Sequence, residues 1–170
     1  MPVNGRDKGK SFELKVAHTL SDWTGQEFHR TPASGALRWK NNKQVVSDIV
    51  PPPAMDWIVS IECKCVEYPW ELDKLLTHKS LFWKHWGQCT GDADRENMVP
   101  MMVFSKAYHD VMCAMRRDDF QMLEGAVPSY IELRDFTNKC HVAIFRLNDL
   151  TAAMTAEKFI KNLRLLHPDY

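Results

Sequence analysis

Residues 60–65, with the sequence SIECKC, constrain this chain of 170 residues more than any other segment. Side chains of a strand point alternately to its two faces, so the odd-numbered positions make one apolar face. Glu62 and Lys64 then share the opposite face of a strand that is otherwise apolar. Charged side chains are rarely placed on such a strand without a partner or a chemical role. Taken alone, the Glu-x-Lys pattern fits a surface ion pair on an edge strand better than it fits a site.

Asp48 adds a second acid within an apolar strand, predicted over residues 45–50 and ended by three prolines at 51–53. If this strand and the one that holds Glu62 run antiparallel, the two carboxylates meet. Such carboxylates repel each other unless a cation lies between them, and oxygen ligands suit Mg²⁺ or Mn²⁺. Glu13, beside the apolar stripe of the first predicted helix, is a candidate third acid. The alternative for Asp48 is a turn or capping aspartate.

The remaining periodicity predicts a mixed α/β fold, a sheet flanked by helices. We expect helices over residues 9–23, 70–88 and 151–165, the last begun by a threonine cap, Thr151. We expect strands over residues 27–30, 45–50, 57–66, 99–104, 129–133 and 140–147, and a polar loop over 91–97. The length fits a single domain, 1–170, with a core at about 5–105 and a C-terminal extension at about 106–170.

Composition narrows the class of protein. Hydrophobic residues make up 45% of the chain and the formal net charge is zero, which excludes a disordered chain and a uniformly basic coat. Residues 1–46 contain eight Lys and Arg residues and four acidic residues, whereas residues 47–98 contain five Lys and Arg residues and nine acidic residues. This asymmetry suits a protein that grips phosphates and also holds a divalent cation, although ordinary solvated faces would look the same. Five irregularly spaced cysteines suggest reduced thiols, and without an apolar leader or membrane span we expect a cytoplasmic protein.

Glu13, Asp48 and the Glu62-Cys63-Lys64 triplet, in this order, resemble the PD-(D/E)XK nuclease pattern. Within that superfamily the chain is most similar to archaeal-type Holliday junction resolvases and related phage endonucleases. The likeness includes the opening segment at residues 9–13 (GKSFE) and the segment at residues 28–35 (FHRTPASG). It extends over roughly residues 5–105. Ser47 stands where the superfamily name has proline.

The resemblance implies a restriction-endonuclease-like αβββαβ core with C-terminal additions, and a metal-dependent endonuclease acting on branched or duplex DNA as a homodimer. It implies a Mg²⁺ or Mn²⁺ ion held by Asp48, Glu62 and the Cys63 carbonyl, with Glu13 assisting. Lys64 would orient the attacking water or stabilise the charge that develops at phosphorus.

Backbone contacts to DNA are expected from Lys10, Arg30 and Ser34, whereas Gln88 fits a plain surface glutamine better than a substrate contact. Trp83 and Trp86 fit core or interface positions better than base stacking. Two alternatives to a junction resolvase stay open. One is a restriction-like or repair-like nuclease of the same fold, and the other is a DNA-binding protein that keeps the fold without catalysis.

Overall fold

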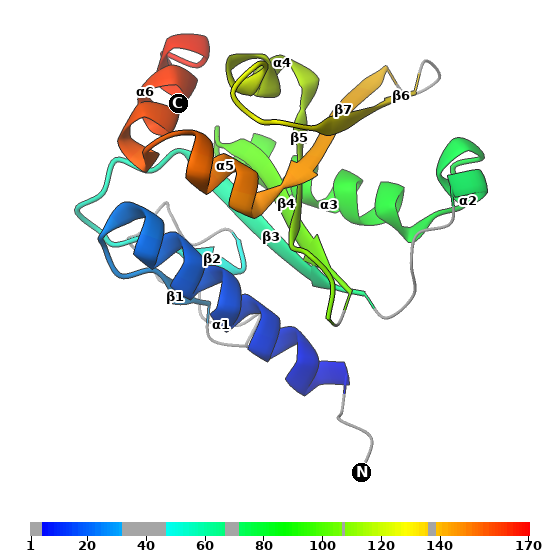
Figure 1. Cartoon of the computed structure of the whole chain (residues 1–170), viewed down its shortest axis with the longest axis horizontal. Coiled ribbons are helices and arrows are strands. Elements are labelled where there is room, and N and C mark those ends of the chain that lie inside the picture. The colour runs from blue at the N-terminus through cyan, green and yellow to red at the C-terminus, as the bar shows by residue number, and fades with distance from the viewer. Residues whose placement is uncertain (1–4, 32–46, 67–71, 107, 136–138) are drawn as a thin grey trace.

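The strand that carries Glu62 lies at the edge of a five-stranded mixed sheet in the computed structural model of the chain (Figure 1). The structure describes residues 5–31, 47–66, 72–106, 108–135 and 139–170. The strand order is β3-β4-β5-β7-β6, with β3 parallel to β4 and every other pair antiparallel. The strands of this sheet are β3 (Val59–Cys65), β4 (Val99–Ser105), β5 (Met112–Arg116), β6 (Tyr130–Asp135) and β7 (Cys140–Arg146).

Two shorter strands, β1 (His29–Arg30) and β2 (Ile49–Val50), pair antiparallel with each other beside the free edge of β3. The helices are α1 (Gly5–Thr24), α2 (Leu72–Leu76), α3 (Leu81–Arg95), α4 (Arg117–Phe120), α5 (Leu147–Ala153) and α6 (Ala156–Leu166), with a 3₁₀ turn at Gln121–Leu123. No helix in the described ranges is long and apolar enough to cross a membrane.

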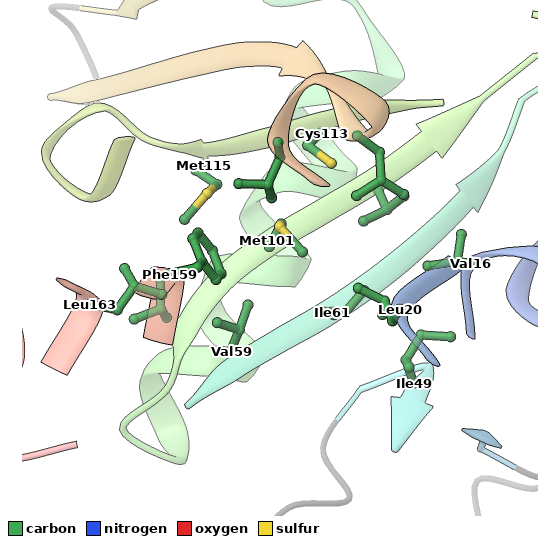
Figure 2. Packing of buried hydrophobic residues seen from close by; sticks show 14 of the residues in the cluster. Val16, Leu20, Ile49, Val59, Ile61, Met101, Cys113, Met115, Phe159 and Leu163 are labelled. Atoms are coloured by element: carbon green, nitrogen blue, oxygen red, sulfur yellow. The ribbon is translucent and has the colours of Figure 1, made fainter. Parts of the chain in front are cut away.

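The two faces of the sheet are covered by different helices. Odd-numbered strand residues, such as Ile61 and Met101, pack with α1, α5 and α6 in the larger core cluster. Figure 2 shows Val16 and Leu20 of α1 and Phe159 of α6 directed at this face. Even-numbered strand residues pack with α3 in a second cluster that includes Phe82, Trp86, Cys89, Met102, Phe104 and Ile144. The mixed α/β sheet flanked by helices that the sequence predicted is therefore confirmed.

The second predicted helix, over residues 70–88, is wrong in its bounds. His78 adopts a positive φ of 57°, and α3 then begins at the cap Ser80, whose hydroxyl accepts the N–H of Phe82. The helix continues to Arg95, through most of the predicted polar loop. Cys89 and Ala93 extend the buried stripe begun by Phe82 and Trp86, and their burial outweighs the low helix propensity of Gly91.

The C-terminal third differs from the prediction in two elements. Strand β5 was missed, although it lies between β4 and β7 and buries Cys113, Ala114 and Met115. The predicted helix over 151–165 is two helices, and the capping threonine is Thr155, whose hydroxyl accepts the N–H of Lys158 at 3.3 Å. Residues beyond 106 thus supply three strands of the same sheet and much of its core.

Candidate active site

Asp48 is bound at two points to the free edge of β3. Its backbone N–H donates to the Ile61 carbonyl at 3.1 Å, and its Oδ2 accepts the N–H of Cys63 at 2.8 Å. The Ile58 carbonyl accepts from the N–H of Val99, and the N–H of Val66 donates to the Ser105 carbonyl, so both residues bond on the β4 side. Successive residues of a strand direct their N–H and C=O groups to alternate edges, so those of Ile61 and Cys63 point to the free edge of β3. The Cys63 carbonyl therefore lies on the same edge as the Asp48 carboxylate. Sequence reasoning expected the two strands to pair antiparallel, but β2 pairs with β1, and Asp48, the residue before β2, donates the backbone hydrogen bond to β3.

Glu62 and Lys64 lie on the face of β3 that α3 covers. Glu62 is buried with 7% of its surface exposed, and its Oε1 accepts a hydrogen bond from Lys64 Nζ. The same oxygen accepts the side-chain N–H of Gln88 at 3.1 Å. Burial lowers the pKa of Lys64, but the hydrogen bond and the charge of Glu62, with the charge of Asp48, outweigh it and leave this pKa raised. Lys64 is thus held as a cation beside two carboxylates.

Glu13 approaches the same centre from α1. Its Oε2 accepts a hydrogen bond from Arg30 Nε at 2.9 Å, and both side chains are about four-fifths buried. Arg30, predicted to contact DNA, is therefore an ion-pair partner of the predicted third acid. The geometry explains the position of both, because β1 lies against α1 and carries Arg30 to it.

The electrostatics show that the three carboxylates share one region. Burial, then the negative charge of Glu62, and further the charge of Glu13, raise the pKa of Asp48 from 3.8 to about 6. The bond from the Cys63 N–H and the charge of Lys64 act in the opposite direction but are outweighed. The Cys63 thiol, buried next to Asp48, Glu13 and Glu62, also has its pKa raised. This excess of negative charge is the environment that a divalent cation relieves.

Two other predicted DNA contacts are less informative. Lys10 is partly exposed on α1, with its Nζ 4.0 Å from Asp7 Oδ1. Ser34 lies outside the described residues.

Sequence reasoning undervalued the face of α3 that lies over Glu62. Gln88 is exposed, as the interpretation as a surface glutamine expects, but its amide also donates to Glu62 Oε1. His85 lies one helical turn before Gln88 on α3. Its Nδ1 is buried without a hydrogen-bond partner among the described residues, and burial and the charges of Lys64 and Lys84 lower its pKa. His85 and Gln88 are three residues apart on the helix that follows the Glu-x-Lys strand, and residues at this spacing lie on one helix face. This spacing could have indicated that both side chains lie near Glu62. The core placement of Trp86 is confirmed, with 3% of its surface exposed.

Comparison with known proteins decides the family. The family model described as "Phage putative PDDEXK endonuclease" matches residues 4–161, which is most of the chain. The chain belongs to this family of phage PD-(D/E)XK endonucleases. The match extends well beyond the segment at 5–105 that carried the resemblance, and it includes β5, β6 and β7. Protein D14 of Escherichia phage T5 is 30% identical over 125 residues, covering 70% of this chain and 75% of that protein. No solved structure matches the chain.

Membership in the PD-(D/E)XK family makes the chain a nuclease of that kind and explains the restriction-endonuclease-like sheet. Nucleases of this kind generally use divalent metal ions. The described side chains contain no group of three or more His, Cys, Asp and Glu residues that converges as a complete metal site. The oxygen set of this PD-(D/E)XK endonuclease still fits a hard cation, because it combines Asp48 and Glu62 with a main-chain carbonyl, while Glu13 is turned to Arg30.

Proposed function

We propose that the chain is a metal-dependent endonuclease that hydrolyses DNA phosphodiester bonds at the centre formed by Asp48, Glu62 and Lys64. The observation that supports this most directly is the double attachment of Asp48 to the edge of β3. This attachment holds the Asp48 carboxylate, whose pKa is raised, next to Cys63, the residue between the buried Glu62 and Lys64. A protein that only bound DNA would gain nothing from holding these acids together, since each repels both the other and the phosphates.

Asp48, Glu62 and the Cys63 carbonyl would hold Mg²⁺ or Mn²⁺ in this proposal. The ion supplies positive charge at the scissile phosphate and makes water a better nucleophile near neutral pH. Asp48 is already fixed by the Cys63 N–H, so one oxygen of its carboxylate has a set position before any ion binds. Gln88 does the same for Glu62, since its amide donates to the carboxylate oxygen that Lys64 also reaches.

The chain's own residues divide the remaining work. Lys64, kept cationic by Glu62 and Asp48, would hold the attacking water or neutralise the charge that grows on the phosphate oxygens. Arg30 sets the direction of the Glu13 carboxylate and cancels part of its charge. Glu13 would then assist the ion through an oxygen or a water that Arg30 does not occupy.

We propose a four-way DNA junction as the substrate and the cytoplasm of the phage's host as the place of action. This rests on the resemblance of the Glu13, Asp48 and Glu62-Cys63-Lys64 pattern to junction resolvases, together with the phage family of the chain. Symmetric cutting of a junction needs two active sites related by a twofold axis, so a homodimer is part of the proposal.

Exposed leucines of α2 and α3 are candidates for the dimer contact. Leu72, Leu76 and Leu81, on α2 and at the start of α3, expose 66%, 71% and 60% of their surface. If these leucines form one patch, they would suit a contact between two copies of the chain. Dimerisation through them would leave the Asp48 edge of the sheet uncovered, because α2 and that edge lie at different sides of the molecule (Figure 1).

The proposed function is tested by incubating the protein with a labelled four-way junction and a matched linear duplex, in Mg²⁺ and in EDTA. Paired cuts near the branch that require Mg²⁺ and disappear in Glu62→Gln would support the whole proposal. Glu157→Gln, an exposed glutamate in the first turn of α6, is the matched control and should cut as the wild type does.

Equal cutting of both substrates would keep the nuclease and refute the preference for junctions. Absence of cutting in Mg²⁺ and Mn²⁺ by a folded protein would instead favour a DNA-binding protein on a nuclease fold. The mass of the protein in solution, with Leu76→Glu as the variant, tests the homodimer: a wild-type monomer would contradict it.

A further inference from the structure

A groove of about 490 Å³ opens at the carboxyl ends of β3 and β4, beside the N-terminal half of α1. Its walls include Phe12 and Lys15 from α1, Cys65 at the end of β3, and Lys106, Tyr108 and Asp110 from the segment that follows β4. Figure 1 places the beginning of α1 and the ends of β3 and β4 at the same end of the molecule. The helix α6 lies at the other end, where the ion pair of Arg164 with Asp56 holds it near the start of β3.

The groove is lined by residues of α1 and β3, the two elements that carry Glu13, Glu62 and Lys64 of the candidate active site. Phe12 lines the groove, and the next residue of α1 is Glu13. Cys65 lines it as well, and the residue before it is Lys64. Cys65 packs on the α1 face of the sheet and Lys64 lies on the α3 face, so a DNA strand that passes from the site into the groove would turn around the end of β3.

The charges of the groove suit a polyanion. Lys15 is exposed and Lys106 is partly exposed, and neither side chain is paired with an acid among the described residues. The one acid in the wall, Asp110, has its Oδ2 3.8 Å from Arg146 Nη1, which offsets its charge. Unpaired lysines beside a catalytic centre are the usual means of holding phosphate groups in position.

Tyr108 stands at the rim of this groove with its whole side chain in water. Its relative exposure is 107%, and its backbone φ of 65° lies in the left-handed region that a tyrosine rarely adopts. The buried hydroxyl of Ser105 lies 2.9, 3.1 and 3.2 Å from the carbonyl oxygens of Lys106, His109 and Asp110. The chain on both sides of Tyr108 is thus tied to one point, which keeps the ring exposed. Such outliers persist where the surroundings over-determine them, and they gather at functional sites.

We propose that this groove binds the DNA strand that continues from the scissile phosphate, with its phosphates on Lys15 and Lys106 and an unpaired base stacked on Tyr108. The inference rests on the proposed function and adds where the strand runs and which feature of the substrate is read. A paired base offers its face only to its neighbours in the stack, so an exposed ring selects a base that a fork or branch has released.

The phosphate part is tested by binding, without cleavage, in EDTA. The probe is a fluorescein-labelled forked duplex, titrated at several salt concentrations with the wild type and with the double variant Lys15→Ala/Lys106→Ala. The affinity falls with rising salt, and each lost phosphate contact makes the negative slope of log K against log salt less steep by about 0.7–0.9. For the double variant we therefore expect a slope less steep by about 1.5 than that of the wild type. The matched control is Lys158→Ala/Lys161→Ala, two exposed lysines of α6 at the far end of the molecule, which should keep the wild-type slope.

The stacking part is tested with 2-aminopurine as the first unpaired base of the fork. We expect quenching of its fluorescence by the wild type and by Tyr108→Phe, which keeps the ring. Tyr108→Ala should lose the quenching and bind the fork about tenfold more weakly, with unchanged affinity for a fully paired duplex.

The outcomes separate this inference from the function on which it rests. If the wild type binds none of these DNAs, the proposed function and the inference fail together. If it binds and the double lysine variant keeps the wild-type salt slope, the groove is refuted while the endonuclease stands. If the double lysine variant shows the less steep salt slope but Tyr108→Ala still quenches 2-aminopurine as the wild type does, only the stacked base is refuted.

Discussion

Replacing Asp48 by asparagine should make the metal-free protein more stable while removing its nuclease activity. The asparagine side-chain oxygen can accept the Cys63 N–H as the carboxylate does, so the attachment to β3 is kept. What disappears is a negative charge that burial and the charges of Glu62 and Glu13 make unfavourable. The substitution therefore isolates the cost of the charge from the contribution of the hydrogen bond.

The size of this effect follows from the pKa of Asp48, which rises from 3.8 in the unfolded chain to about 6 in the folded protein. A shift of one unit corresponds to about 1.4 kcal/mol, which gives about 3 kcal/mol before solvent screening and about 1–2 kcal/mol after it. Because the folded-state pKa is raised, the folded protein holds this proton more tightly than the unfolded chain does. The stabilisation from protonated Asp48 is thus complete below about pH 4 and is lost as pH rises through about 6.

The assay is urea unfolding of the wild type and Asp48→Asn in EDTA, followed by circular dichroism. We expect the variant to be more stable by about 1–2 kcal/mol at about pH 8, and the difference to vanish near pH 4. Mn²⁺ should then reverse the order at about pH 8, because an ion that binds only the folded wild type stabilises it alone. A variant less stable than the wild type at both pH values in EDTA, or stabilised equally by Mn²⁺, would refute this account of Asp48.

Three further predictions concern neighbouring groups. Lys64→Ala should lower the rate of DNA cleavage by about 10²–10⁴-fold while the Mn²⁺ affinity, measured by calorimetry, stays within a few-fold of the wild type; a rate near the wild-type value would contradict its role. Gln88→Ala removes one of the two donors to Glu62 Oε1 and so holds this carboxylate less firmly, and we expect kcat to fall by about tenfold with DNA affinity in EDTA unchanged. Lys84→Ala, at an exposed residue of the same helix, serves as the control. His167→Ala removes the 2.6 Å contact of its Nε2 with the buried Asp119 and should cost about 2–4 kcal/mol of stability near pH 7. Burial raises the pKa of Asp119 despite His167, so this loss should shrink as acid protonates the carboxyl, and a pH-independent loss measured by urea unfolding would exclude the explanation.

Local patterns predicted the centre of the molecule well. Alternation around Glu62 placed a strand at residues 57–66, and β3 occupies 59–65 with Ile61 and Cys63 in the core. A carboxylate in an apolar segment before a proline run placed Asp48 near Glu62. Both signals are local in sequence and survive folding because they depend on burial and on the geometry of a strand.

The misses come from interactions that sequence periodicity does not report. Strand β5 buries three successive residues, Cys113, Ala114 and Met115, so its sequence shows no alternation, and its place is fixed by pairing with both β4 and β7. The extension of α3 through Gly91 depends on Ala93, whose burial is decided by the sheet beneath it. The ion pair of Arg30 with Glu13 joins residues 17 positions apart, so neither residue alone predicted the other as its partner.

The position of β3 at the edge of its sheet has a consequence for handling the protein. An exposed edge offers unpaired N–H and C=O groups to other chains and is a common origin of aggregation. Asp48 occupies two of these groups on β3, so the residue proposed to hold the metal also closes the sheet. A substitution such as Asp48→Ala keeps the backbone bond to the Ile61 carbonyl but removes the carboxylate, which leaves the Cys63 N–H open to another molecule. Inactive protein for trapping a DNA complex is therefore better made as Asp48→Asn, which keeps the edge closed at concentrations that crystallisation requires.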